Sequence, residues 1–265
     1  MCIMAEPVQS VSDTNIFVGR CGAEQATVYA MSVTLRARVG RGNAMILPVP
    51  IGSADVSSIR LVDLSAMPEF FKPLDALFQE RSRGMSKGIS RGMDDDDDLE
   101  VVQLGSYDVS IVPTVNDVKR LNRATFEVSP DTENVLRTNY PVGFAFLVAQ
   151  LRESGSFHPI GYIHPIIGDR LFIPTRHEHG GRPNALPKWD HKVFHQGVKL
   201  DVTPRVGGNG ASVRTIPSLP KIMQAFRDEV TVKAAPLASF IDVTGPLSRV
   251  LAEGPLPNID LTVQA

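Results

Sequence analysis

The run Ala26-Thr27-Val28-Tyr29-Ala30-Met31-Ser32-Val33 consists almost entirely of β-branched, aromatic and other apolar residues, which is typical of a buried β-strand. Glycine-containing breaks follow such runs, and two of them, Cys21-Gly22 and Gly40-Arg41-Gly42, have the composition of hairpin turns. Hairpins connect antiparallel neighbours, so this part of the chain predicts an antiparallel sheet rather than strands alternating with crossover helices. Runs of the same kind lie nearby at 15–19, 44–50 and 59–64.

The rest of the chain adds strands and a few helices. The segment 99–113 alternates like a strand or hairpin, and 143–152 has the continuous apolarity of a buried strand. Ser129 followed by Pro130 predicts the start of a helix that runs to about Asn139. Further helices are expected at 68–80 and 218–229, with a last turn or two at 246–253. The predicted fold is α+β, a mainly antiparallel β-sheet or sandwich with a few helices, in a single globular domain over 1–265.

Composition limits the classes of partner. The chain has 265 residues, 43% of them hydrophobic and 21% charged, with a formal net charge of −2. It has no overall basic field for nucleic acid, no apolar run long enough for a membrane span, and no basic region followed by an apolar run at its start. We therefore expect a soluble, cytoplasmic protein that binds neither nucleic acid nor membrane. A small-molecule or protein partner and a homo-oligomer stay open.

One stretch differs abruptly from the rest. Arg81, Arg83, Lys87 and Arg91 lie among glycine and serine, and Asp94–Asp98 is an unbroken acidic run. Such a composition gives a core nothing to bury, so we predict a flexible charged loop at about 81–98. The acidic run could attract a cation or a basic partner, although a solvated loop is the simpler interpretation.

The histidines are the most unusual feature of the sequence. All six lie between Phe157 and Gln196, at His158, His164, His177, His179, His191 and His195. Imidazole is the commonest transition-metal ligand and the usual acid or base near neutral pH. Residues two apart share one face of a strand, which applies to His177 and His179. Residues four apart share a face of a strand or a helix turn, which applies to His191 and His195.

These spacings predict a metal centre in which His177 and His179 are joined by His191 or His195. Glu178 or Asp190 would orient a ligand ring or a bound water, and zinc, iron, manganese or copper would suit the imidazoles. With three protein ligands, an open position would hold a polarised water, which predicts a metal-dependent, hydrolase-like enzyme. Two alternatives stay open: the histidines act as acids or bases without a metal, or they are structural, with each ring bonded to a nearby backbone group.

The first residues suggest a second chemistry. Removal of Met1 would leave Cys2 at the N-terminus, where the free α-amino group can take the thiol proton. In this respect the start resembles the N-terminal nucleophile amidohydrolases and glutamine amidotransferases, although Ile3 and Met4 follow the cysteine here. The resemblance implies that Cys2 is a catalytic nucleophile, against the alternative of an incidental apolar cysteine. A third class, a non-catalytic binding or structural protein, remains beside these two enzymes.

Overall fold

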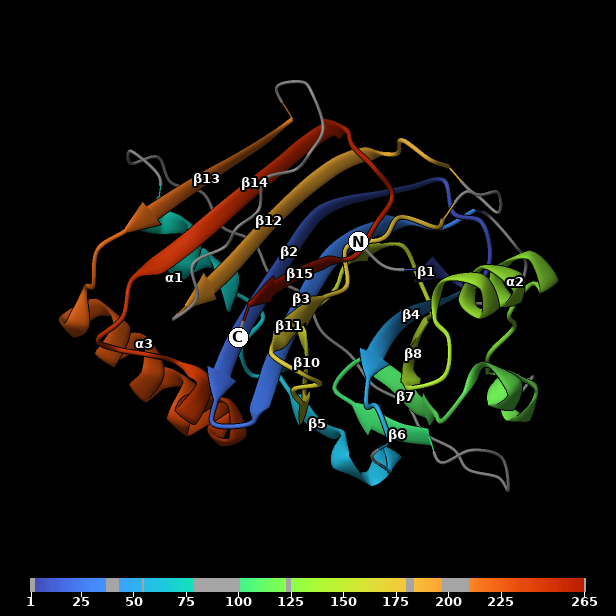
Figure 1. The fold of residues 1–265 in the computed structure, drawn as a ribbon, viewed down its shortest axis with the longest axis horizontal. Helices are drawn as coiled ribbons and strands as arrows, with labels where there is room; N and C mark the ends of the chain where they lie inside the picture. Colours follow the sequence, from blue (N-terminus) through green and yellow to red (C-terminus); the bar gives the residue numbers. More distant parts are fainter. Residues whose placement is uncertain are drawn as a thin grey trace.

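The computed structural model describes residues 3–36, 43–53, 55–78, 101–122, 125–179, 184–196 and 210–264, and its architecture is two sheets packed face to face (Figure 1). The larger sheet has the strand order β13-β14-β12-β2-β3-β10-β5, with β9 paired to β3. Its strands are β2 (Ser10–Cys21), β3 (Glu24–Thr34), β5 (Arg60–Asp63), β9 (Gly155–Ser156), β10 (Ile160–Pro165), β12 (Lys188–Gln196), β13 (Ala211–Ile216) and β14 (Leu247–Pro255).

The smaller sheet has the order β1-β4-β8-β7-β6, and a two-stranded ribbon pairs β11 with β15. The strands of the smaller sheet are β1 (Ile3–Met4), β4 (Asn43–Pro50), β6 (Val101–Leu104), β7 (Tyr107–Val112) and β8 (Phe144–Leu151). The ribbon consists of β11 (Arg170–Ile173) and β15 (Leu261–Gln264). Each pair of described strands is antiparallel except β2 with β12. The predicted α+β class is therefore confirmed.

The helices cover the outer faces of the sheets. Residues of α1 (Phe71–Ala76), α3 (Pro220–Lys233) and η3 (Ala235–Phe240) pack on the outer face of the larger sheet. Those of α2 (Pro130–Asn139) and η2 (Val115–Arg120) pack on the outer face of the smaller one (Figure 1). The third 3₁₀ segment, η1 (Val56–Ser58), precedes β5. None of the helices in the described ranges is both long enough and apolar enough to cross a membrane.

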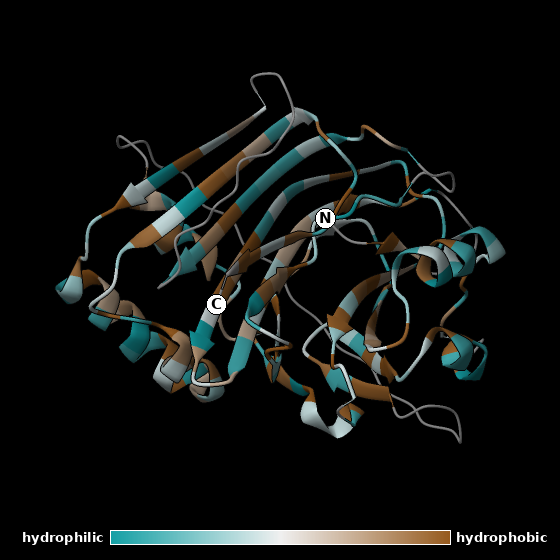
Figure 2. Ribbon diagram, viewed as in Figure 1, coloured by the Kyte–Doolittle hydropathy of each residue, from teal (hydrophilic) through white to brown (hydrophobic). Residues whose placement is uncertain are grey.

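This layering explains why the central strands β3 and β8 carry hydrophobic residues on both faces. Successive side chains of a strand point to opposite faces of the sheet. On β3, Tyr29 packs into the core between the two sheets, whereas Val28 packs into the core beneath α1 and α3. On β8, Leu147 faces the inter-sheet core and Phe146 faces α2. Both faces of these two strands are buried, so hydrophobic side chains point to both sides, and hydrophobic segments (brown) lie along the strands of both sheets (Figure 2).

Local signals placed several elements correctly. The predicted turn at Cys21-Gly22 joins β2 to β3, and Gly22 has the positive φ of 58° that such a turn favours. Ser129 caps α2, because its Oγ accepts a hydrogen bond from the Thr132 amide, and Pro130 opens the helix. The predicted turn at Gly40-Arg41-Gly42 lies outside the described residues. The helix expected at 68–80 is shorter than predicted, since α1 covers only Phe71–Ala76.

The helical turn expected at 246–253 is wrong. That segment is the strand β14, which pairs with β12 on one side and with β13 on the other. Its buried residues Leu247, Val250 and Ala252 reach three different core clusters. Two neighbouring strands satisfy its backbone groups, so pairing over long sequence distances overrides any local preference for a turn.

Candidate functional site

Three of the predicted histidine ligands lie together. His177 and His179 follow β11, and His191 lies on β12. The His177 Nε2 is 3.4 Å from the His191 Nδ1, and the ring centroids of His177 and His179 are 5.7 Å apart. The indole of Trp189 lies against two of these rings, with centroids 5.3 Å from His177 and 4.6 Å from His191. The group is a buried aromatic cluster at one end of the larger sheet.

The other histidines lie elsewhere. His195 is on the same strand as His191, but four residues of extended chain separate the two by about 13 Å, too far to share a metal ion. His158 accepts a hydrogen bond from the Ser106 amide through its Nε2, and Gly105 must be glycine there because a Cβ would lie 2.4 Å from that nitrogen. His164 stacks on Tyr162, with ring centroids 5.8 Å apart. The rings of His158, His164 and His195 therefore lie outside the cluster, although they are close to it in sequence.

Burial sets the charge of the cluster. His177 and His191 are 2% and 0% exposed, and loss of solvation lowers the pKa of both imidazoles well below its usual range. The same effect raises the pKa of Glu178 to about 6 and raises the pKa of Asp190. At neutral pH the histidine rings are therefore uncharged.

The carboxylates do not orient the rings as predicted. Glu178 Oε1 accepts a hydrogen bond from Asn258 Nδ2 at 2.8 Å. Asp190 Oδ1 is 3.8 Å from His191 Nδ1, beyond hydrogen-bond distance. Within the described ranges no three His, Cys, Asp or Glu side chains are arranged to hold a metal ion. The geometry therefore does not support the predicted centre, and metal binding stays a prediction.

Asn258 holds the loop that carries His177, and nothing in the sequence pointed to it. Its Oδ1 accepts from the His177 amide at 2.7 Å, and its Nδ2 donates to the His177 carbonyl at 2.8 Å. On the other side of this loop, the Met4 amide donates to the Glu178 carbonyl at 2.8 Å. Cys2 itself lies outside the described residues. A backbone hydrogen bond from β1 and side-chain hydrogen bonds from Asn258, just before β15, thus hold this loop in place. These contacts stabilise the fold of the loop.

The predicted charged loop, at about 81–98, also lies outside the described residues, but the structure fixes both of its flanks. Phe78 follows α1 and packs against Phe194 of β12 in the larger sheet, with ring centroids 6.0 Å apart. Val101, the first described residue after the loop, begins β6, an edge strand of the smaller sheet. The last described residue before 79–100 thus lies at the outer face of one sheet, and the first one after it lies at the edge of the other.

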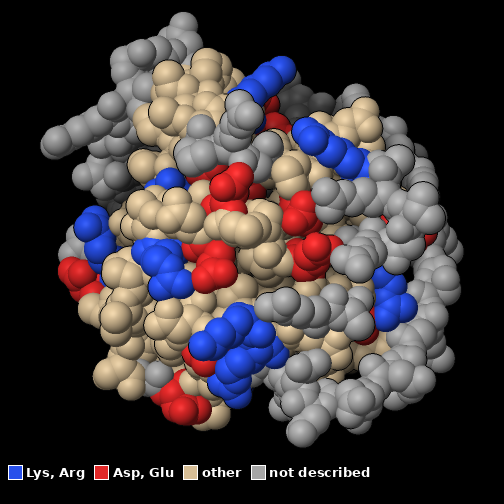
Figure 3. Space-filling model, turned by 90° about the vertical axis from the view of Figure 1, so that its right-hand side faces the viewer, with Lys and Arg blue, Asp and Glu red and all other residues tan. Residues whose placement is uncertain are grey.

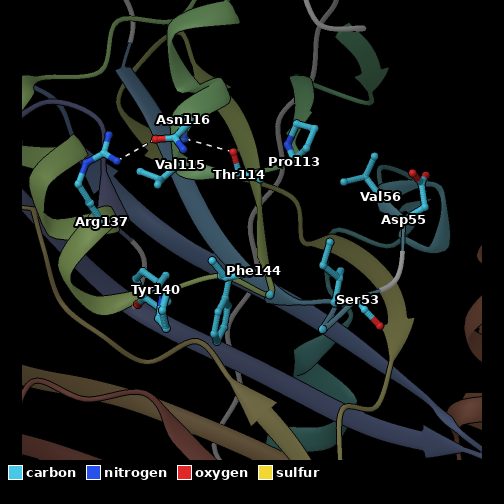
Figure 4. Close-up of a pocket in the computed structure, with 15 residues that line it drawn as sticks. Ser53, Asp55, Val56, Pro113, Thr114, Val115, Asn116, Arg137, Tyr140 and Phe144 are labelled. Atoms are coloured by element: carbon cyan, nitrogen blue, oxygen red, sulfur yellow. Dashed lines mark hydrogen bonds between the residues drawn. The ribbon is translucent and has the colours of Figure 1, made fainter.

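A cavity of about 610 Å³ opens between α2, η2 and the chain after β4 (Figure 4). Its polar groups bond to each other: Arg137 donates to Asn116 Oδ1 at 2.8 Å, and the Asn116 amide donates to Thr114 Oγ1 at 3.2 Å. Figure 3 shows both signs of charge on the face of the molecule that lies to the right in Figure 1. Arg137 also pairs with Glu133 at 2.8 Å. None of the predicted site residues lines the cavity.

No family model matches the chain. Solved structures match it across nearly its full length. A mutated baculovirus P35 after caspase cleavage aligns with a TM-score of 0.51 and 14% identity, over 98% of this chain and 100% of that one. A second structure of mutated, caspase-cleaved baculovirus P35 aligns with a TM-score of 0.50 and 13% identity, over 96% and 100%. At this identity the likeness is one of fold.

These comparisons correct the functional prediction. The metal-dependent, hydrolase-like enzyme is wrong, because the fold is that of a protein that a caspase cuts. The physical reason is geometric: in the described ranges the candidate ligands do not converge on one point, and Glu178 is bonded to Asn258. The alternative of an N-terminal-cysteine amidohydrolase is untested, because Cys2 lies outside the described residues. The third class, a non-catalytic binding or structural protein, stays a proposal.

Proposed function

We propose that this chain is a non-catalytic protein that binds a caspase and presents the segment 79–100 to it as a substrate. The observation that carries the proposal is the match of nearly the whole chain to P35 structures determined after caspase cleavage. A caspase is a cysteine protease that cuts after aspartate. The acidic run Asp94–Asp98 supplies five adjacent candidate cleavage positions within one segment.

The fold is suited to survive such a cut. A break in the segment 79–100 interrupts no described strand or helix. Strands before the segment pair with strands after it, since β2 lies beside β12, β3 beside β10, and β4 beside β8. Both halves contribute to the core between the sheets. The cut chain therefore stays folded as one body and can remain bound to the protease. An ordinary substrate, by contrast, is released after it is cut.

The test is incubation of the purified chain with caspase-8 and with an effector caspase, with residual activity measured on a fluorogenic peptide. We expect inhibition accompanied by one cut, which intact mass places within Asp94–Asp98. Changing all five of these residues to asparagine should weaken inhibition at least about 100-fold, because the protease recognises a carboxylate before the scissile bond.

Two controls make this test specific. Asp228→Asn changes an exposed carboxylate on α3, far along the chain from the segment, and should inhibit like wild type. Deletion of 84–98 should abolish inhibition while leaving the melting temperature nearly unchanged, because the deleted sequence gives a core nothing to bury. Absence of both cutting and inhibition in the unchanged chain, with every caspase tried, would contradict the proposal.

A further inference from the structure

The cavity between α2, η2 and the chain after β4 continues into an exposed apolar rim. Val142 lines the cavity with a fully exposed side chain, and Ile167, just after β10, is 42% exposed. Gly52 lies between them: its amide donates to the Gly143 carbonyl at 3.0 Å, and a Cβ at Gly52 would lie 3.1 Å from the Ile167 Cδ1. We call the cavity together with Val142 and Ile167 the apolar cleft.

The walls of the apolar cleft are largely apolar as well. The rings of Tyr140 and Phe144 lie edge to face with centroids 5.3 Å apart, and Val115 lies near them (Figure 4). The Tyr140 hydroxyl is already bonded within the protein, since it donates to Asp260 Oδ2 at 2.7 Å. A cavity of about 610 Å³ is large enough for a ligand or an inserted side chain. Exposed apolar side chains that continue an apolar cavity mark an interaction site.

Among the described residues, one charge in this lining has no ion-pair partner. Asp55 caps η1, and its Oδ1 accepts a hydrogen bond from the Ser57 amide at 2.8 Å. That hydrogen bond lowers the pKa of the Asp55 carboxyl, so the group is negatively charged at neutral pH. Arg137, on the opposite side of the cleft in Figure 4, is paired with Glu133 at 2.8 Å. The cleft therefore presents one unmatched negative charge beside apolar walls.

We propose that the apolar cleft binds an exposed segment of a partner protein in which a large apolar side chain is next to a basic one. The apolar side chain enters the cavity, and the basic one faces Asp55. A small molecule inside the cavity leaves Val142 and Ile167 exposed, whereas a protein surface covers the cavity and its rim together. This site does not include the segment that the proposed function assigns to the protease, and it is independent of that function.

The test uses short peptides as probes of this chemistry. The peptide acetyl-Gly-Phe-Lys-Gly-amide carries both features, and two matched peptides each lack one, with Glu in place of Lys or Ser in place of Phe. Each peptide is titrated into the full chain, and the dissociation constant is taken from the NMR shifts of the protein amides. The amides that move also show where the peptide binds.

Two variants of the chain remove the same two features from the cleft. Asp55→Asn removes the charge but keeps a side chain that can cap η1. Val142→Ser removes the exposed apolar side chain of the rim without opening the core. The matched controls are Asp228→Asn and Val232→Ser, because both of these residues are exposed on α3 and lie outside the cleft.

We expect the Phe-Lys peptide to bind with a dissociation constant of about 1 mM and to shift the amides that line the cavity. Asp55→Asn and Val142→Ser should each weaken its binding about threefold, as should each change in the peptide. The two α3 variants should bind it like the unchanged chain. Added salt should weaken the binding in the unchanged chain but not in Asp55→Asn.

Three results would overturn the proposal, and none of them depends on caspase inhibition. The first is equal affinity for the three peptides, or no binding at about 10 mM. The second is amide shifts that lie outside the cleft. The third is a dimer in sedimentation velocity that Val142→Ser dissociates and Val232→Ser does not, because a second copy of the chain would then occupy the cleft.

Discussion

Replacing Phe70 by alanine lowers the free energy of unfolding by about 3–5 kcal/mol, one of the largest effects we expect from a single substitution in this chain. Phe70 opens α1 and is 1% exposed. Its ring centroid lies 5.8 Å from that of Phe17 on β2 and 5.2 Å from that of Phe226 on α3, both edge to face. The ring therefore joins α1, the larger sheet and α3, and its removal leaves a cavity that all three line.

The measurement is equilibrium unfolding in denaturant, with the midpoint compared at constant slope. Lys72→Ala on the same helix is the matched control, because Lys72 is exposed and pairs with Glu69 at the surface. It should change the free energy of unfolding by less than about 0.5 kcal/mol. A Phe70→Ala variant as stable as the control would show that the Phe70 ring does not join α1 to the larger sheet and to α3.

The sequence predicted those elements whose signals are local. The β2–β3 hairpin follows from two apolar runs and a glycine turn, and α2 follows from Ser129 and Pro130. Each signal lies within a few residues of the element it specifies. The parallel pairing of β2 with β12 joins His191 to Thr14 across most of the chain, and no local pattern encodes such a contact.

The site shows the same division. Proximity in sequence correctly placed His177 near His179. The spacing of His191 and His195 allowed either a helix turn or one face of a strand, and the two lie on the strand β12. It could not reveal that this strand separates them, or that Asn258 holds the His177 loop from 81 residues away. Asp75 and Arg249 form an ion pair although they are 174 residues apart, and no motif in the sequence around either residue indicates the contact. Histidines that gather in sequence indicate a site only when the fold also brings their nitrogens to a common point.

Acidification from pH 6.5 to pH 5 should lower the contribution of three buried histidines to the free energy of unfolding by about 5 kcal/mol, because these histidines resist protonation in the folded chain. Burial lowers the pKa of His164 to about 4 and the pKa of His177 and His191 well below the usual range. In the unfolded chain each takes up a proton near pH 6.5. Below that pH the unfolded state binds more protons, so stability falls by roughly 1.4 kcal/mol per pH unit for each histidine.

One carboxylate opposes this loss and provides a paired test. Burial raises the pKa of Glu178 to about 6, so the folded chain protonates it before the unfolded chain does, and its contribution grows as the pH falls from 6 to 4.5. Stability is measured by denaturant unfolding between pH 7 and pH 5 in two variants. His164→Gln should flatten the decline by about one proton, and Glu178→Gln should steepen it. Equal free energies of unfolding at pH 7 and pH 5 would mean that the folded chain protonates these rings as readily as the unfolded chain does. That result would contradict their burial in this fold.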